Sequence, residues 1–303
     1  MVKRLRIGSR GSKLAVLQAE SVRNQLLVNN ADVECEMVTI ATTGDRNTAV
    51  SLDQLGGDGV FVKEIEEALL GNEIDIAVHS LKDMLTTLPE GLILAAVPLR
   101  VDPRDVLISP HGKLEDLPPG ARIGTGSIRR VVQLRAIRPD LEISNLRGNI
   151  DTRIRKAFSG EFDGIVMAAA ALLRLDMEDR ITEYLPVTDF VPAVGQGALG
   201  IEIRCEDDWL MKMLEPLNDQ PAWQSITAER AFLRALGGGC RAPIAALGII
   251  EHGILKINGI VANTAGDRIM RDGIEGNPGD PDATGKSLAS KMIDLGADEL
   301  IVI

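Results

Sequence analysis

The alternation of short apolar runs with longer amphipathic stretches constrains the fold of this chain more than any other feature. Strand-like runs are predicted at 5–8, 33–40, 74–78, 122–124, 141–144, 164–167 and 198–204. Between several of them, apolar residues recur with the 3.6-residue period of a helix, at 12–27, 62–70, 128–138 and 151–158. This order predicts an α/β fold with parallel sheets covered by helices.

The pattern changes in the last third of the chain. Residues 209–217 and 226–236 are predicted to be helical, and strands joined by turns are expected around Gly253 and Gly259. One more helix is expected from 283 to 295. The final segment is therefore predicted to be a small α+β module, and 303 residues are enough for three domains.

Charge and aromatic content exclude one class of partner. The formal net charge is -11, and the chain contains one Tyr and two Trp. Nucleic-acid binding needs positive charge and stacking side chains, so no nucleic-acid partner is expected. No apolar run approaches the roughly 20 residues that cross a bilayer, and no signal segment is visible, so we expect a cytoplasmic protein without a membrane partner.

Cysteine and histidine are too scattered to predict a shared centre. The three cysteines, Cys35, Cys205 and Cys240, are odd in number and far apart, which argues against a disulfide framework. The histidines are equally dispersed along the chain. No metal site is therefore predicted.

One predicted strand leads into a polar turn. The run 74–78 is followed by His79-Ser80-Leu81-Lys82-Asp83. Ligands of parallel α/β sheets bind beyond the carboxyl ends of strands, so Lys82 and Asp83 are candidates for a site. An exposed Lys-Asp pair on a turn is an equally good interpretation of this pentapeptide alone.

Basic residues gather at the ends of other strands. Residues 121–160 carry nine Arg or Lys against three acids. Within them, the turn 124–130 offers the hydroxyls of Thr125 and Ser127, the start of a helix, and the charges of Arg129 and Arg130. A capped helix with two solvated arginines is the alternative.

Two further segments repeat this geometry: Arg147 precedes a helix that carries Arg153, and Arg10 with Ser12 precedes the first helix. Because the planar arginine fork pairs with carboxylates, converging arginines predict a ligand with several carboxylates.

Three other positions have both a functional and a plain structural interpretation. Cys240 follows a triple-glycine loop beside Arg241, which favours a reactive thiol, but the loop also suits a helix C-cap. Gln196 lies in a hinge-like or plain inter-domain turn. Phe61 either closes a flap formed by the preceding glycines or anchors the next helix.

Taken together, these segments resemble the hydroxymethylbilane synthase family, also called porphobilinogen deaminase. The resemblance covers more than two thirds of the chain and adds little in the last sixty residues. Its segments are 10–12, 56–63, 77–83, 102–105, 125–130, 146–149, 192–198, 227–230 and 238–243.

The resemblance implies a particular architecture. Two periplasmic-binding-protein-like domains are expected, the first discontinuous over 1–98 and 198–217 and the second over 103–192. A small α+β C-terminal domain, 221–303, would carry the cofactor. The family resemblance also implies a monomer.

The resemblance also implies chemistry. The family condenses four porphobilinogen units, with loss of ammonia, into linear hydroxymethylbilane, primed on a dipyrromethane. That cofactor would be held covalently by a thioether to Cys240, and Asp83 would be the catalytic carboxylate. The expected cofactor and substrate-binding residues are Arg10, Ser12, Phe61, Lys82, Thr125, Ser127, Arg129, Arg130, Arg147, Arg153, Arg174 and Gln196.

Some residues depart from the family pattern. Asp58 stands where many relatives have Lys, Gly126 where many have Ser, and Met84-Leu85 replaces a common Val-Pro. Three other functions are compatible with parts of the sequence: a non-catalytic binding protein for an anionic ligand, a phosphate-handling transferase, and a cysteine hydrolase. No signal peptide is visible, as the binding protein would need. The transferase would need a metal-binding carboxylate pair, and no convincing pair is seen. The hydrolase would need a His partner for Cys240, and none is recognisable.

Overall fold

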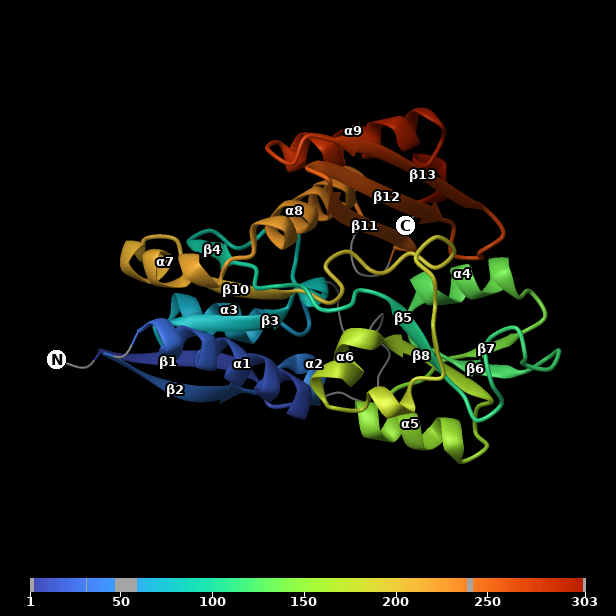
Figure 1. Ribbon diagram of the computed structural model, residues 1–303, viewed down its shortest axis with the longest axis horizontal. Helices are drawn as coiled ribbons and strands as arrows, with labels where there is room; N and C mark the ends of the chain where they lie inside the picture. Colours follow the sequence, from blue (N-terminus) through green and yellow to red (C-terminus); the bar gives the residue numbers. More distant parts are fainter. Residues whose placement is uncertain (1–2, 31, 47–58, 239–241, 302–303) are drawn as a thin grey trace. The chain divides into compact units, whose positions relative to one another are not determined.

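The computed structural model describes residues 3–30, 32–46, 59–238 and 242–301 (Figure 1). Two compact units are formed, unit 1 from residues 1–101 and 198–223 and unit 2 from residues 102–197 and 224–303. Unit 1 is therefore discontinuous, and residues 224–303 group with the second half of the chain. The expected division into three domains stays a prediction.

Unit 1 contains a five-stranded mixed sheet in the order β2-β1-β3-β10-β4. Strand β1 pairs in parallel with β2 and β3, while β10 is antiparallel to both β3 and β4. The strands are β1 (Lys3–Arg10), β2 (Val33–Ile40), β3 (Ile76–Ser80), β4 (Leu92–Ala96) and β10 (Leu199–Arg204). The helices are α1 (Lys13–Asn29), α2 (Thr43–Arg46), α3 (Lys63–Leu70), η2 (Leu81–Asp83), α7 (Asp208–Leu214) and η4 (Glu215–Leu217).

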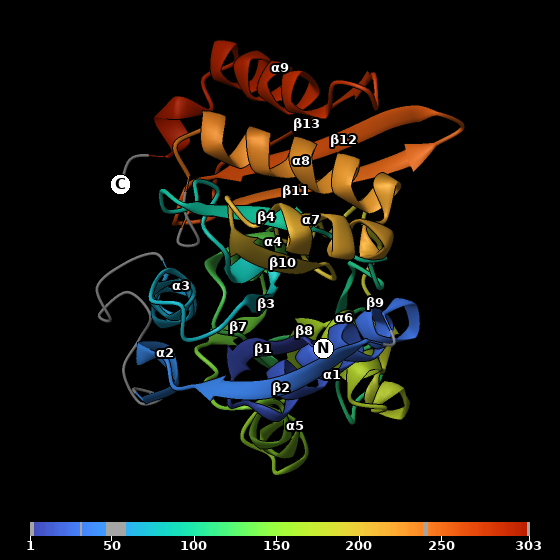
Figure 2. The same ribbon diagram turned by 90° about the vertical axis from the view of Figure 1, so that its left-hand side faces the viewer.

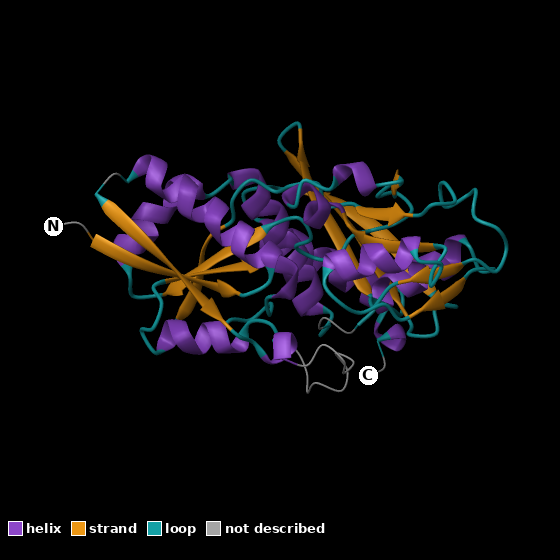
Figure 3. Ribbon diagram, turned by 90° about the horizontal axis from the view of Figure 1, so that it is seen from below, coloured by secondary structure: helices purple, strands orange, loops and turns teal. Residues whose placement is uncertain are grey.

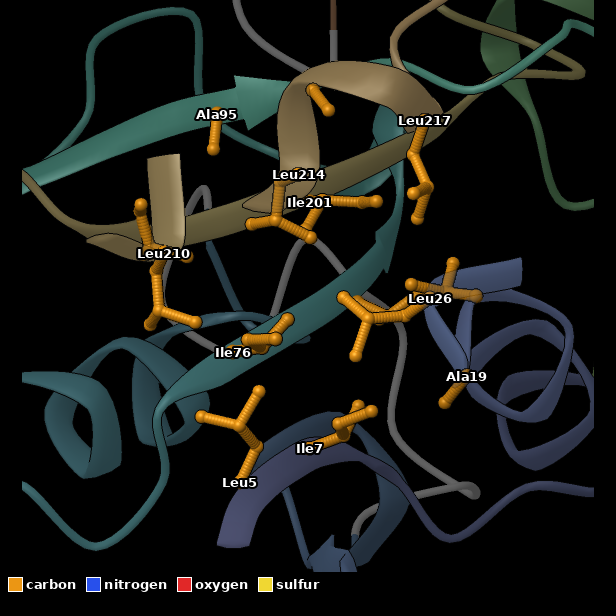
Figure 4. Close-up of a cluster of buried hydrophobic side chains, with 14 of the residues drawn as sticks. Leu5, Ile7, Ala19, Leu26, Ile76, Ala95, Ile201, Leu210, Leu214 and Leu217 are labelled. Carbon is orange, nitrogen blue, oxygen red and sulfur yellow. The ribbon is translucent and has the colours of Figure 1, made fainter. Parts of the chain in front are cut away.

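One core of unit 1 fills the space between its sheet and helices α1 and α7 (Figure 4). Alternate strand residues such as Ile7, Ile76 and Ile201 point into it, as the two-residue period of a strand requires. Leu26 of α1 and Leu214 of α7 meet them. A second cluster packs α3 on the opposite side chains of the same strands. Helices therefore hold β3 on both faces.

Unit 2 contains a second five-stranded mixed sheet, in the order β7-β6-β8-β5-β9. Strands β6, β7 and β8 are parallel, and β5 is antiparallel to β8. The strands are β5 (Asp105–Ile108), β6 (Arg122–Gly124), β7 (Glu142–Ser144), β8 (Gly164–Ala168) and β9 (Glu183–Tyr184). The helices are α4 (Ile128–Ile137), α5 (Ile150–Phe158), α6 (Ala169–Arg174) and η3 (Glu178–Arg180). Figure 3 shows helices lying alongside the strands.

The two five-stranded sheets share one topology. In unit 1, β1 lies between β2 and β3, and the antiparallel β10 separates β3 from β4. In unit 2, β6 lies between β7 and β8, and the antiparallel β5 separates β8 from β9. The antiparallel strands β5 and β10 are the first strands formed after the chain enters unit 2 at residue 102 and after it returns to unit 1 at residue 198, respectively. This arrangement agrees with the expected pair of periplasmic-binding-protein-like domains. The sheets were expected to be parallel, but each is mixed, because β10 and β5 run antiparallel to the strands beside them.

The C-terminal part of unit 2 is the predicted α+β module, a three-stranded antiparallel sheet with two long helices (Figure 2). Its elements are α8 (Gln220–Ala235), β11 (Ile244–Glu251), β12 (Ile254–Ala262), β13 (Ile269–Gly276), α9 (Pro281–Asp294) and η5 (Asp298–Leu300). Gly253 lies in the β11–β12 turn as expected. Gly259 does not lie in a turn: it is inside β12, where a Cβ atom would be 2.6 Å from Phe232 Cζ.

Two element boundaries also differ from the sequence expectations. Strand β3 begins at Ile76 instead of Ile74, because the Ile74 amide still bonds to the Ala68 carbonyl at the end of α3. Helix α8 begins at Gln220, six residues earlier than predicted. The Asp219 carboxylate accepts a bond from the Ala222 amide there and caps the first turn.

Candidate functional site

The carboxyl end of β3 presents the predicted catalytic acid. Strand β3 passes directly into η2, and the Leu81 amide is fixed to the Ala198 carbonyl at 3.1 Å. Asp83 is half-buried, and no other described residue bonds to or forms an ion pair with its carboxylate. Ser80, just before the turn, exchanges hydrogen bonds with Gln18 of α1. Asp83 thus follows a strand end that is held by a backbone hydrogen bond, and its carboxylate oxygens accept no bond from the described residues.

Arg10 ends the neighbouring strand β1 and already has partners. Its Nη2 atom lies 2.6 Å from Asp45 Oδ1, and its guanidinium carbon lies 4.1 Å from the Phe61 ring centroid. Burial opposes ionisation of Asp45, but the hydrogen bond and charge of Arg10 lower the pKa of that carboxyl. Ser12 caps α1, with Oγ accepting from the Ala15 amide. Arg10 and Phe61 are therefore adjacent, and Asp45 offsets the arginine charge.

A buried ionisable cluster lies between α3 and the sheet of unit 1. His79 Nε2 is 2.9 Å from Glu202 Oε2, and Glu66 of α3 is buried nearby. Glu66 Oε1 and Glu202 Oε1 have no hydrogen-bond partner among the described residues. Burial and the charge of Glu202 raise the pKa of Glu66 to about 7.

The corresponding edge of unit 2 forms the predicted anion-binding turn. The Thr125 amide bonds to the Ser144 carbonyl, and the Leu146 amide bonds back to the Thr125 carbonyl. Ser127 precedes α4, but its side chain makes no capping bond. At Gly126 a Cβ atom would lie 3.0 Å from the Leu146 carbonyl oxygen, so a larger residue would crowd this turn.

Arg129 and Arg130 are buried in the first turn of α4. Both converge on Asp105, which has no exposed surface and starts β5. The distances are 2.8 Å from Arg129 Nη1 to Oδ2 and 2.8 Å from Arg130 Nη2 to Oδ1. Burial opposes ionisation of Asp105, but the two guanidinium charges outweigh it and lower its pKa to about 2.

The segment returning to unit 1 is fixed at two points. Gln196 Nε2 donates to the Pro103 carbonyl at 2.7 Å and to Asp105 Oδ1 at 3.0 Å. The amides of Gly195 and Gly248 each donate to the buried Glu229 carboxylate at 2.8 Å. Gln196 therefore lies in a hydrogen-bonded turn whose backbone has positive φ at Gly195.

The remaining predicted arginines differ in their hydrogen-bond partners. Arg153 Nε donates to the Gly148 carbonyl at 2.7 Å. Arg147 Nε is buried without a hydrogen-bond partner among the described residues. Arg174, at the end of α6, donates to the Gly197 carbonyl, and burial lowers its pKa to about 10. No described carboxylate pairs with Arg147 or Arg174.

Some predicted features lie outside the described residues. These are Cys240 and the glycine-rich segment that contains Asp58. Sequence reasoning also did not single out several acids near the candidate residues, since their partners come from distant parts of the chain. They are the half-buried Asp45 and the buried Glu66, Asp105, Glu202 and Glu229.

Comparison with known proteins identifies the family. Residues 5–212 match the family described as porphobilinogen deaminase, dipyromethane cofactor binding domain, and residues 223–294 match porphobilinogen deaminase, C-terminal domain. The chain belongs to the porphobilinogen deaminase family. The porphobilinogen deaminase of Syntrophobacter fumaroxidans is 45% identical over 298 residues, which cover 98% of this chain and 96% of the relative. That of Geobacillus kaustophilus is 48% identical over 297 residues, covering 97% and 96%.

Solved structures also include distant matches. The periplasmic aliphatic sulphonate binding protein SsuA from Escherichia coli is 14% identical, with a TM-score of 0.41, over 77% of this chain and 70% of that chain.

Family membership confirms the resemblance inferred from the motifs and defines the activity. The chain is a transferase of tetrapyrrole biosynthesis, a hydroxymethylbilane synthase that uses a dipyrromethane cofactor and the substrate porphobilinogen. The non-catalytic binding protein is not favoured by these matches. Among the described helices, none is long and apolar enough to cross a membrane.

Proposed function

We propose that this chain joins four porphobilinogen units through Asp83, on a dipyrromethane attached to Cys240 by a thioether. In each condensation, the aminomethyl carbon of the substrate loses ammonia and bonds to a free pyrrole carbon, which releases its proton. A final water supplies the hydroxyl group of the linear product. The observation that supports the proposal most directly is the Asp83 carboxylate just after β3, which has no partner among the described residues, in a chain matched by its family nearly end to end.

Asp83 is proposed to stabilise the positive charge that develops as ammonia leaves. A carboxylate beside a developing cation lowers the barrier most when it is already fixed in place. The bond from the Leu81 amide to the Ala198 carbonyl supplies that rigidity, and the free oxygens of Asp83 can accept from pyrrole N–H groups. The adjacent Lys82 is proposed as a supporting donor.

The donor set of unit 2 fits a ligand that carries several carboxylates. Arg174 and the buried Nε of Arg147 lack carboxylate partners among the described residues, and an anionic ligand would supply them. Ser127 has a hydroxyl that caps no helix. When bound, the dipyrromethane supplies the pyrrole to which the first substrate unit is joined. We propose that these side chains hold its acetate and propionate groups and those of the substrate.

The other members of the proposed set are more strongly engaged within the protein. Arg10 pairs with Asp45, and Arg129 and Arg130 share Asp105, so their net positive charge is reduced. Phe61 offers a ring face beside Arg10. Thr125, Arg153 and Gln196 are proposed to contribute hydrogen bonds. Ser12 keeps its hydroxyl proton available while its oxygen caps α1.

Cys240 is proposed as the attachment point from its place between two described elements. Helix α8 ends at Ala235, and β11 begins at Ile244, so the cysteine lies in the connection. Gly237 in that connection adopts positive φ. We further propose a cytoplasmic monomer that binds no nucleic acid, for which light scattering of the purified protein would measure the mass in solution.

The test of the catalytic assignment is Asp83→Asn, measured as hydroxymethylbilane formation from porphobilinogen. The substitution removes the charge but keeps the shape, so kcat is expected to fall by about 100-fold or more while the protein stays folded. Glu90→Gln, an exposed acid before β4, is the matched control and should leave kcat unchanged. An Asp83→Asn protein with wild-type kcat would refute the assignment.

The test of the arginine assignment is Arg174→Ala. Loss of one charged hydrogen bond to a ligand carboxylate is worth about 1.5–3 kcal/mol, so KM should rise by roughly 10- to 100-fold. Arg180→Ala is the control, since that arginine is exposed and faces Asp179. Equal KM values for the Arg174 variant and the wild type would remove Arg174 from the set.

A further inference from the structure

Asp105 has no place in the proposed catalytic and binding set, yet it contacts three members of that set. Its Oδ1 accepts from Arg130 Nε at 3.0 Å, from Arg130 Nη2 at 2.8 Å and from Gln196 Nε2 at 3.0 Å. Its Oδ2 lies 2.8 Å from Arg129 Nη1. One carboxylate therefore gathers side chains from α4 and from the segment that returns to unit 1.

Backbone carbonyls accept hydrogen bonds from both guanidinium groups. Arg129 Nη1, which forms an ion pair but no hydrogen bond with Asp105 Oδ2, donates to the Val191 carbonyl at 2.7 Å, and Arg130 Nη1 donates to the Val166 carbonyl at 3.1 Å. The arginine fork is planar, so contacts through Nε, Nη1 and Nη2 fix the orientation of Arg130 as well as its position, whereas Arg129 is held through Nη1. Removing Asp105 would leave each group with fewer of these contacts.

The position of Asp105 in the sheet places this network at the ligand-binding edge of unit 2. Because β5 is antiparallel to β8, its first residue, Asp105, pairs with Ala168 at the carboxyl end of β8. The turn that carries Thr125 follows the carboxyl end of the parallel strand β6. Asp105 is fully buried at this edge, so it contacts the two arginines without exposure to solvent.

The charge balance separates two possible roles. Two guanidinium groups and one carboxylate carry a net charge of +1, and no other described carboxylate forms an ion pair with either arginine. If Asp105 mattered only through its charge, it would weaken the attraction of an anionic ligand. If it orients the arginines, its loss would weaken binding despite the gain in positive charge.

We propose that Asp105 is a positioning residue that holds Arg129, Arg130 and Gln196 in the arrangement that receives ligand carboxylates. The inference rests on the proposed function and extends it to a residue that itself touches no substrate. Carboxylates lie away from the reacting carbon atoms, so their binding affects the ground state and the transition state alike. Disturbing it should therefore change KM and cofactor loading more than kcat.

The experiment compares wild type with Asp105→Asn and Asp105→Glu, well below the melting temperature of each variant. Asn removes the charge, and Glu moves it by one methylene. Both variants are expected to raise KM for porphobilinogen by about 10-fold or more, with kcat within about three-fold. Both should also lower the fraction of chain that carries a cofactor adduct, measured as intact mass. Asp102→Asn, whose half-exposed carboxylate pairs with Arg104, is the control expected to match wild type.

The outcomes are distinguishable. An unchanged or lower KM in a folded Asp105 variant would overturn the positioning role, and if Asp105→Asn gives no folded protein, Asp105→Glu decides. In a double-mutant cycle with Arg130→Gln, the two losses should be strongly non-additive, and additive losses would contradict action through Arg130. A wild-type protein without turnover or adduct would instead refute the proposed function itself.

Discussion

The two five-stranded sheets have the same strand order, yet they neutralise buried charge in different ways. Each antiparallel strand carries a buried carboxylate, Glu202 on β10 and Asp105 on β5. Asp105 meets the guanidinium groups of Arg129 and Arg130. Among the described residues, Glu202 bonds to the imidazole of His79 alone, with the carboxyl group of Glu66 close by. The shared topology therefore does not dictate the electrostatics of its interior.

These differences make the two units sensitive to opposite ends of the pH range. The pKa of Asp105 is lowered to about 2, so its contribution to stability is full above its ordinary pKa and is lost as pH falls through 2. The pKa of Glu66 is raised to about 7, so its protonated form favours the folded state. Its contribution is full below its ordinary pKa and is lost as pH rises towards 7.

The largest effect is expected from Asp105→Ala. The change leaves two buried guanidinium groups without their carboxylate, which typically destabilises a protein by about 3–5 kcal/mol. The free energy of unfolding from urea titration at pH 7 measures it. Asp102→Ala removes a half-exposed partner of Arg104 and should cost less than about 1 kcal/mol. Similar values for both variants would contradict the role of Asp105 as the partner of two buried arginines, on which the contrast with unit 1 rests.

A smaller and opposite effect is expected from Glu66→Gln. The amide stays neutral, so it removes the cost of ionising a buried acid above pH 7. A pKa displaced from 4.5 to about 7 corresponds to roughly 3 kcal/mol, gained at pH 8 and absent near pH 4. Thermal unfolding at both pH values measures this difference, with Glu67→Gln on the exposed face of α3 as the control. A stabilisation independent of pH would contradict the raised pKa of Glu66.

The smallest effect distinguishes the equivalent turns after β1 and β6. Ser12 caps α1 through Oγ, whereas Ser127 makes no capping bond to α4. Ser12→Ala should therefore destabilise the fold by about 1 kcal/mol, and Ser127→Ala by only a few tenths. Urea unfolding separates the two. A Ser127→Ala loss as large as that of Ser12→Ala would show that both serines serve the fold equally.

Local signals in the sequence predicted much of this fold. The cap at Ser12, the glycine after α3 and the 3.6-residue period of α5 act over a few residues, and the corresponding elements form where expected. The reversal of β5 and β10 could not be inferred in the same way. Strand direction depends on where the chain crosses between units, which periodicity does not record. Strands β4, β5, β9 and β13 were not predicted, and the burial of β13 does not alternate between faces.

The candidate site was predictable only in part. Motif order placed Asp83, Arg10 and the turn at Thr125 at strand ends, and the structure finds them there. The pairing of Asp105 with Arg129 and Arg130 joins residues more than twenty positions apart, and nothing in their spacing signals it. Which arginines lack a carboxylate partner is likewise a property of packing.

The most direct test of the account is the intact mass of the purified protein, followed by peptide mapping. The account predicts an added mass equal to two linked pyrrole units, located on the peptide that contains Cys240 and absent from Cys240→Ser. Protein isolated without the adduct should acquire it on incubation with porphobilinogen. A Cys240 that stays unmodified after this incubation, or an adduct on Cys35 or Cys205, would contradict the account.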